Sequence, residues 1–371
     1  MIDWMPPVCS LLFPEFPPED QRHHHEALMQ ALQRVLLSGR FVLADEVRTF
    51  ETEFAEFLGS GQVVGTGSGT DAIELLLRAD GIGHGDGVIV PTLAPSAVAA
   101  AVMRTGATIV LCDVDEETLT LCPVALGGLI DRHPRLRAVI AVHLYGHPCR
   151  WDCLAAVCGA NRLALIEDAS QAHGATWEGR TVGSLGRASV WSFYPTKNLA
   201  ALGDAGAIWT NDAELAEKLR WYREYGWRHR HLSDFPGINS RLDEIQAAVL
   251  RVKLPSLAGQ VRRRRELASR YRASLTGVRL PPEGPECGHA YHQFVVRTRE
   301  RNPLQDHLRR RGIPAAVHYP AALHQQPAFA CRELFPVAER AVSEVLSLPF
   351  HPYLGEEAIE AVISAVADFE S

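Results

Sequence analysis

The chain lacks any run of about 20 apolar residues, the length that a membrane-spanning helix requires. It also lacks an excess of basic charge, because 37 Lys and Arg stand against 44 Asp and Glu, giving a formal net charge of −7 at pH 7. Without a basic domain to neutralise phosphates, nucleic acid is not expected as a partner. The N-terminus has no basic start followed by an apolar run, so we expect neither a secretory leader nor a membrane partner.

Cysteine is scarce, with 8 residues in 371, and no two cysteines have C-x-x-C spacing. No paired histidines follow at zinc-ligand distances, so no metal site is expected. Free thiols suit a reducing compartment, and we therefore expect a cytoplasmic protein. The densest basic run, Arg262 to Arg265, lies in a charge-rich helical pattern and is interpreted as a solvated helix face.

Short apolar runs alternate with helical periodicity through the first two thirds of the chain. Near-continuous apolar strands separated by helices predict a mostly parallel sheet that is covered on both faces. The predicted strands are Gln62–Gly65, Gly87–Pro91, Thr108–Leu111, Ala138–Leu144, Leu163–Glu167, Ala188–Phe193 and Ala207–Thr210.

The pattern divides the chain into three parts. Residues 1–25 are proline-rich and are predicted to be irregular, and residues 26–255 form the large domain. A long helical segment is predicted from Asn239 to about Leu275, with the boundary inside it. Strand and helix patterns then alternate again, which indicates a smaller C-terminal α+β domain over residues 256–371. The predicted fold class is therefore α/β, with a three-layer α/β/α large domain.

The segment from Val63 to Thr70 runs from a strand through a glycine-rich turn into a predicted helix. The first amides of a helix are unpaired, and together with the helix dipole they form a binding site for phosphate. A capped turn without a ligand has the same composition, so this segment alone does not distinguish a phosphate site from a capped turn.

Two further residues carry chemistry. Asp168 ends an apolar strand, where open α/β sheets place ligand-binding groups, although it could also cap the next segment. Lys197 follows another strand, and lysine forms Schiff bases when its pKa is lowered, although most lysines are solvated surface charges. Together, a phosphate cradle, an acid for a ring nitrogen and a Schiff-base lysine are the parts that a pyridoxal 5'-phosphate (PLP) enzyme needs.

The motifs around these residues resemble those of the DegT/DnrJ/EryC1/StrS family of sugar aminotransferases. The resemblance covers roughly residues 35–369 and implies a PLP enzyme of fold type I, with the aspartate-aminotransferase-like architecture. The shared motifs are Ser68–Ala72, Val142–Gly146, Glu167–Gly174, Ser192–Leu199, Asn239–Ala248, His318–Pro320 and Leu346–Pro349.

The resemblance implies a role for each matching residue. Lys197 is the covalent anchor of PLP and the proton carrier, and Asp168 pairs with the pyridine nitrogen. The resemblance also implies a homodimer whose active sites are shared across the interface. The other implied contacts are phosphate binding by Gly69, Thr70 and Ser192, contact of Gln171 with the cofactor's phenolic oxygen or ring, binding of the neighbouring subunit's phosphate by Asn239, and weaker substrate contacts by His318 and Tyr319. Tyr319 could equally be an aromatic residue packed before a proline turn.

The implied reaction moves an amino group from glutamate or glutamine to a 3- or 4-keto-6-deoxy sugar on a nucleotide such as dTDP, in amino-sugar or antibiotic biosynthesis. One alternative is amination of a keto-cyclitol of the scyllo-inosose type. A different class is a non-catalytic relative used for binding or regulation. The family's dehydratases replace the lysine with histidine, so Lys197 argues against that branch.

The chain departs from the family pattern at two positions. Where an aromatic residue usually covers the cofactor ring, the sequence after Pro91 offers only Leu93 or Pro95. Ala205 stands where glycine is usual, which matters only if that position needs a positive φ.

Overall fold

The computed structural model describes residues 18–370, which contain a seven-stranded sheet in the order β1-β9-β8-β5-β4-β2-β3. β9 runs antiparallel to both of its neighbours, while the remaining pairs are parallel. All seven predicted strands are present, with bounds within two residues of those expected. The strands are β1 (Gln62–Thr66), β2 (Gly87–Pro91), β3 (Thr108–Cys112), β4 (Leu136–Val142), β5 (Ala164–Asp168), β8 (Ala188–Ser192) and β9 (Gly206–Thr210).

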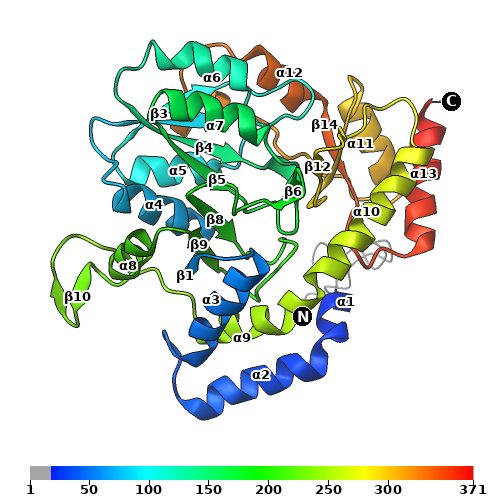
Figure 1. Ribbon diagram of the computed structural model, residues 1–371. Coiled ribbons are helices and arrows are strands. Elements are labelled where there is room, and N and C mark those ends of the chain that lie inside the picture. Colours follow the sequence, from blue (N-terminus) through cyan, green and yellow to red (C-terminus); the bar gives the residue numbers. More distant parts are fainter. Residues whose placement is uncertain (1–17, 371) are drawn as a thin grey trace, which may run out of the picture.

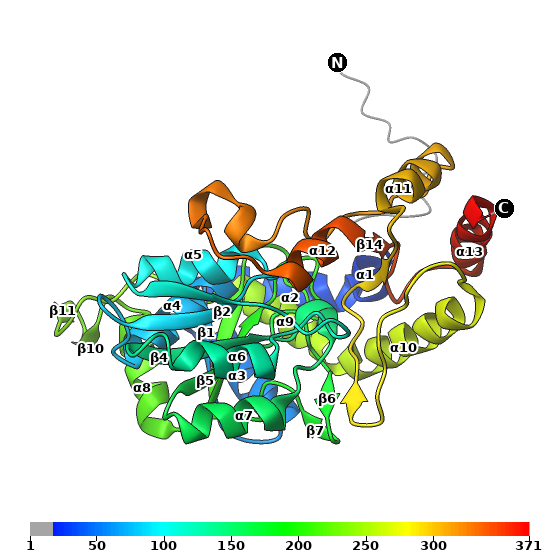
Figure 2. The same ribbon diagram turned by 90° about the horizontal axis from the view of Figure 1, so that it is seen from above.

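Helices cover both faces of this sheet, which confirms the three-layer prediction (Figures 1 and 2). Strand side chains alternate between the layers, so that Val88 and Val90 join one apolar cluster and Ile89 joins the other. The helices of the first layer are α4 (Gly69–Ala79), α5 (Ser96–Arg104) and α8 (Ala213–Tyr222). Those of the second are α3 (Asp45–Phe57), α6 (Pro123–Ile130), α7 (Trp151–Ala160) and α9 (Glu244–Lys253).

The C-terminal part has its own apolar cluster around a two-stranded antiparallel sheet. This sheet pairs β13 (Phe294–Arg297) with β14 (Val345–Leu348). The helices that contribute to the cluster are α10 (Leu257–Ser274), α11 (Arg301–Arg310) and α13 (Glu356–Glu370). By contrast, the buried side chains of α12 (Pro336–Glu344) join a cluster of the large sheet.

Smaller elements complete the described chain. The N-terminal helices are α1 (Pro18–His23) and α2 (His25–Ser38), so the prediction of an irregular segment over residues 1–25 is wrong for α1, while residues 1–17 lie outside the described part. A hairpin of β10 (Trp227–His229) and β11 (Leu232–Ser233) projects from the large sheet's side of the molecule (Figure 1). A three-stranded sheet joins β6 (Thr176–Trp177), β7 (Arg180–Thr181) and β12 (Cys287–Gly288).

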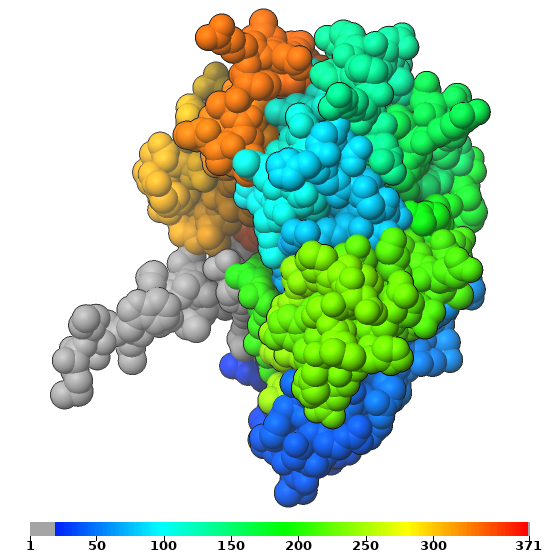
Figure 3. Space-filling model, turned by 90° about the vertical axis from the view of Figure 1, so that its left-hand side faces the viewer, coloured from blue at the N-terminus to red at the C-terminus, as the bar shows by residue number. Residues whose placement is uncertain are grey.

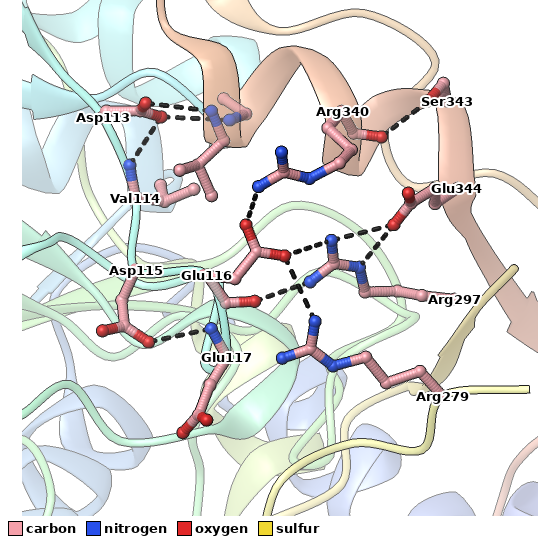
Figure 4. Close-up of polar contacts among 12 residues, drawn as sticks. Asp113, Val114, Asp115, Glu116, Glu117, Arg279, Arg297, Arg340, Ser343 and Glu344 are labelled. Atoms are coloured by element: carbon pink, nitrogen blue, oxygen red, sulfur yellow. Dashed lines mark hydrogen bonds and ion pairs between the residues drawn. The ribbon is translucent and has the colours of Figure 1, made fainter. Parts of the chain in front are cut away.

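An ion-pair cluster, here named the Glu116 clasp, ties the loop after β3 to the C-terminal part (Figure 4). The Glu116 carboxylate pairs with Arg279 at 3.1 Å, with Arg297 at 2.8 Å and with Arg340. Arg297 is only 6% exposed, pairs with Glu344 at 2.8 Å and donates to the Glu116 carbonyl oxygen at 2.6 Å. The clasp therefore joins the loop after β3 to three segments that are far from it in the sequence, around residues 279, 297 and 340–344.

The interpretation of the basic run Arg262–Arg265 as a solvated face is wrong for Arg264, which is only 6% exposed. α10 turns one stripe inward, and Val261, Arg264, Ala268 and Tyr271 follow one another along it at three- and four-residue spacing. Charge density along the sequence does not reveal which residue of the run falls on that stripe.

Within residues 18–370, no helix is long and apolar enough to cross a membrane. The same part of the chain contains no group of three or more His, Cys, Asp or Glu side chains arranged to hold a metal ion. The described cysteines are free, and they are Cys112, Cys122, Cys149, Cys153, Cys158, Cys287 and Cys331.

Candidate active site

A cavity of about 240 Å³ opens at the edge of the sheet where β1, β5 and β8 end and β9 begins. Carboxyl ends of parallel strands are where open α/β sheets bind ligands. The cavity brings together six of the residues predicted from the sequence, which are Gly69, Thr70, Asp168, Gln171, Ser192 and Lys197.

The start of α4 forms one wall of this cavity. Ser68 caps the helix by accepting a hydrogen bond from the Asp71 amide at 3.1 Å, so the capped turn is present. The preceding helical amides, those of Gly69 and Thr70, are in the positions that bind phosphate at a helix N-terminus. A Cβ on Gly69 would lie 2.8 Å from the Ser192 Cβ, so glycine lets the helix start sit against β8. Capping and phosphate binding are therefore compatible here.

Asp168 lies at the end of β5 and is 3% exposed. Its Oδ1 accepts a hydrogen bond from the Ser170 amide at 3.0 Å, so it does cap the next turn. Burial raises the pKa of Asp168, while the Ser170 hydrogen bonds and the charge of Lys197 act in the opposite direction. A buried carboxylate is stable only with a cationic or donating partner, and a protonated ring nitrogen supplies both.

Lys197 lies on the turn that follows β8, and its amide donates to the Tyr194 carbonyl at 2.8 Å. The neighbouring Asn198 anchors this turn by donating to the Ala290 carbonyl at 3.1 Å. Burial lowers the pKa of Lys197 to about 8, although the charge of Asp168 partly opposes this. A larger fraction of the amine is therefore neutral near pH 7 than in a solvated lysine, which suits a nucleophile.

A hydrogen-bonded network connects this cavity to the segment that carries the weaker candidates. Gln171 accepts from the Tyr145 amide at 2.6 Å and donates to the Tyr319 hydroxyl at 3.1 Å. The Tyr145 hydroxyl donates to the His318 carbonyl oxygen, and His318 Nδ1 lies 2.9 Å from Ser347 Oγ. Tyr319 is thus bonded directly to a cavity residue rather than merely packed before the proline.

Asn239 does not line its own chain's cavity. It is exposed and forms an isolated β-bridge with Glu224. Its neighbour Ser240 accepts from the Gly67 amide at 2.9 Å and donates to Asp71 at 2.8 Å. The segment containing Asn239 is therefore fixed against the phosphate turn while the asparagine itself remains open to the surface.

The cavity lining also contains residues that were not singled out from the sequence, among them Ser170, Tyr194 and Asp204. Ser170 and Tyr194 lie within the family motifs, and this position in the motifs could have identified them from the sequence. Asp204 lies in the segment between Lys197 and β9, and only the return of the chain into β9 brings it to the cavity.

The two departures from the family pattern have simple outcomes. Pro95 and Ala97 line the cavity, whereas Leu93 is buried in the apolar core. Of the two expected residues, Pro95 is therefore the one that can cover the cofactor. Ala205 is not among the residues with a positive φ, so its Cβ causes no backbone strain.

The mostly parallel sheet, the helix N-terminus and the buried acid and lysine together define a fold-type-I PLP enzyme. The profile of the DegT/DnrJ/EryC1/StrS aminotransferase family matches residues 22–367. The chain belongs to this family.

Characterised relatives cover nearly the whole chain. It is 44% identical to dTDP-3-amino-3,4,6-trideoxy-alpha-D-glucose transaminase of Streptomyces venezuelae, over 91% of each chain. It is 42% identical to dTDP-3-amino-3,6-dideoxy-alpha-D-galactopyranose transaminase of Aneurinibacillus thermoaerophilus, over 92% of this chain and 95% of the relative. The crystal structure of S. venezuelae DesV matches with a TM-score of 0.92 and 42% identity, covering 95% of this chain and 96% of that one.

The residues present fit the family's cofactor. Bacillus subtilis NtdA, a structure with bound PMP, matches with a TM-score of 0.88 and 26% identity, covering 98% of this chain and 89% of that one. In this chain the cavity supplies helix amides for a phosphate, an acid that needs a protonated partner and a lysine with a lowered pKa. Bound PLP supplies an electron-withdrawing ring that stabilises negative charge at the donor's Cα.

Proposed function

We propose that this enzyme transfers an amino group from glutamate or glutamine to a 3- or 4-keto-6-deoxy sugar carried on a nucleotide, in amino-sugar or antibiotic biosynthesis. The observation that carries the proposal is that the buried Asp168 and the half-buried Lys197 line one cavity beside the start of α4. The names of two relatives that are more than 40% identical support dTDP as the nucleotide.

The proposed roles of the residues are those that the resemblance to the family implies, and the presence of six of these residues in one cavity supports them. Lys197 Nζ anchors the cofactor and then moves a proton between the donor's Cα and the cofactor's C4′ carbon. Asp168 keeps the pyridine nitrogen protonated, and Gly69, Thr70 and Ser192 bind the phosphate. The other contacts proposed are ring contact by Gln171 and sugar contact by His318 and Tyr319.

The active enzyme is proposed to be a homodimer, in which Asn239 reaches the phosphate of the partner subunit's cofactor. Asn239 is exposed beside its own phosphate turn, and apolar side chains are exposed nearby. Leu36 is 62% and Leu37 79% exposed, and Phe41 and Val42 are each 47% exposed. Val42 forms a bridge with Asp243, so this apolar surface continues into the Asn239 segment.

The same face carries the β10–β11 hairpin. Figure 3 shows the hairpin region, in yellow-green, directly above the blue N-terminal helices. A second copy covering this face would bury the exposed apolar residues and bring each asparagine to the other chain. The free cysteines support a cytoplasmic location as part of the same proposal.

A panel of keto substrates tests the function. The purified enzyme with PLP is given glutamate or glutamine together with 3-keto or 4-keto dTDP- and UDP-sugars or scyllo-inosose, and the amine product is measured. We expect amination of a dTDP-linked keto sugar and none by the Lys197→Ala variant. Preferred amination of the cyclitol would establish the alternative substrate class. A protein that binds PLP but aminates none of these substrates would contradict the proposal and favour a binding or regulatory role.

A further inference from the structure

A second cavity, of about 80 Å³, lies next to the active site, and Lys197 lines both. It is enclosed by the turn after β8, by α10 and by the segment 350–353. Its lining includes two cationic side chains that are almost fully buried, Lys253 at 3% and Arg264 at 6% exposure. Burying two cations together is unfavourable unless anions accompany them.

The charge of Lys253 is matched within the chain. Its ammonium group lies 2.7 Å from the Asp20 carboxylate. Asp20 also accepts hydrogen bonds from the Tyr353 hydroxyl at 2.8 Å and from Gln260 Nε2 at 3.2 Å. Asp20 carries a single negative charge, which pairs with Lys253 and acts on Arg264 only from a greater distance, so the two buried cations exceed it by one charge.

The charge of Arg264 is not matched by any ion pair within the described residues. Its guanidinium donates to the Tyr291 carbonyl at 3.0 Å, and its Cζ lies 5.9 Å from the centre of the Phe350 ring. Its Nε is buried and has no hydrogen-bond partner. Burial lowers the pKa of Arg264 to about 10, so the group is still cationic at neutral pH.

Two histidines add unpaired polar atoms to the same lining. Nδ1 of His292 and both ring nitrogens of His351 are buried without partners. Burial lowers the pKa of His351 to about 4 and that of His292 well below its usual value, so both rings are neutral. Neutral imidazoles can donate hydrogen bonds to an anion beside Arg264 without adding charge.

The cofactor cavity itself contains no arginine among its described lining residues, and its ionisable groups that carry formal charge are Asp168, Lys197 and Asp204. In an amino-acid donor, the α-carboxylate is attached to the same carbon as the amino group that is transferred. Binding of that amino group at the cofactor therefore brings the carboxylate close to Lys197. We propose that Arg264, at the cavity shared with Lys197, binds a carboxylate of the amino-acid donor. The inference rests on the proposed function, since it names the group that recognises the donor in that reaction.

Arg264→Gln tests this inference in the PLP-loaded enzyme, with Arg263→Gln as the matched control. Arg263 is the preceding residue on α10 and pairs with Glu266 at 3.3 Å on the surface. The two half-reactions are measured separately by the absorbance of the cofactor. We expect Arg264→Gln to weaken glutamate binding at least tenfold, because charge-assisted hydrogen bonds are the strong ones. The apparent affinity for the keto sugar in the second half-reaction should stay unchanged. In Arg263→Gln, the affinities for glutamate and for the keto sugar should both stay at their wild-type values.

Calorimetry with glutarate, a dicarboxylate without an amine, provides a readout that is independent of turnover. Wild-type enzyme and Arg263→Gln should bind it, while Arg264→Gln should lose most of the affinity and Arg264→Lys should recover part. Comparing glutamate with its α-amide and its γ-amide then identifies which carboxylate Arg264 binds.

A folded Arg264→Gln enzyme with wild-type affinity for glutamate and glutarate would overturn the inference while leaving the transaminase assignment intact. An equal loss of affinity for donor and keto sugar would also overturn it, because Arg264 would then only support the backbone at Tyr291. If Arg264→Gln does not fold, Arg264→Lys decides the question by the same binding measurements. Failure of the proposed function is distinguishable, since the wild-type enzyme would then aminate no keto substrate.

Discussion

At the scale of single residues, burial pulls the pKa values of the acid and the lysine toward neutrality from opposite sides. The pKa of Asp168 is raised and that of Lys197 is lowered to about 8, because the charged form of each is costly in a closed cavity. Their mutual attraction limits both shifts. The effect on Lys197 can be measured.

The rate at which the apoenzyme takes up PLP should rise with pH, with a midpoint near pH 8, and level off about one pH unit above that midpoint. Only the neutral amine of Lys197 is nucleophilic, and its pKa is lowered to about 8 by burial. Stopped-flow absorbance at a series of pH values checks this expectation. A rate that continues to rise past pH 10 would show an ordinary solvated lysine.

Asp168→Asn should shift this pH midpoint downward. The carboxylate raises the pKa of Lys197 through its charge, and an amide removes that contribution. The same variant should fold but lose several orders of magnitude in turnover, each tenfold loss corresponding to about 1.4 kcal/mol of transition-state stabilisation. Turnover close to wild type would mean that Asp168 serves only to cap the turn at Ser170.

The sequence predicts Asp168 and Lys197 because Asp168 ends one apolar strand and Lys197 lies on the turn after another, and strand ends meet at one edge of a parallel sheet. It does not predict Arg264, which looks like part of an exposed basic run. Whether a helical arginine points inward depends on what the helix packs against. That information comes from distant segments such as 350–353 and is absent from the local pattern.

At the scale of elements, the Glu116 clasp holds the loop after β3 against three segments (Figure 4). Glu116→Gln should lower the free energy of unfolding, because the buried Arg297 would then keep only Glu344 as an ion-pair partner. We expect a loss of about 1–3 kcal/mol, which lies between the values typical of exposed and of buried ion pairs. Thermal or denaturant unfolding measures the effect. Asp306→Asn is the control, because its pair with Arg309 is exposed and local, and its removal should change little. Equal stability of the two variants would show that the clasp contributes nothing.

The seven strands of the sheet were predictable because each is a short apolar run between turns. The prediction of one long helical segment from Asn239 to Leu275 was wrong, because this part of the chain is divided into several elements. The chain there forms a bridge at Asn239, then α9, a 3₁₀ turn at Leu254–Ser256 and α10. Pro255 lacks an amide hydrogen and interrupts the regular helix, whereas the bridge depends on pairing with a residue outside the local sequence.

At the scale of the whole molecule, the large domain and the C-terminal part meet at the smaller of the two cavities that share Lys197. The domain boundary near residue 255 stays a prediction. In the proposed dimer, Asn239 of each chain reaches the active site of the other chain. Two-fold symmetry makes the exchange reciprocal, so each chain lends its asparagine and receives its partner's.

Mixing two inactive variants tests whether the site is shared. Lys197→Ala and Asn239→Ala should each be nearly inactive as pure dimers. In a mixed dimer, one site carries both lesions, while the other combines an intact Lys197 with an intact Asn239 from the partner. Random pairing makes about half of the dimers mixed, so unfolding and refolding the variants together should restore roughly a quarter of all sites. Refolding each variant alone should restore none. If mixed dimers form without regaining activity, Asn239 serves its own chain.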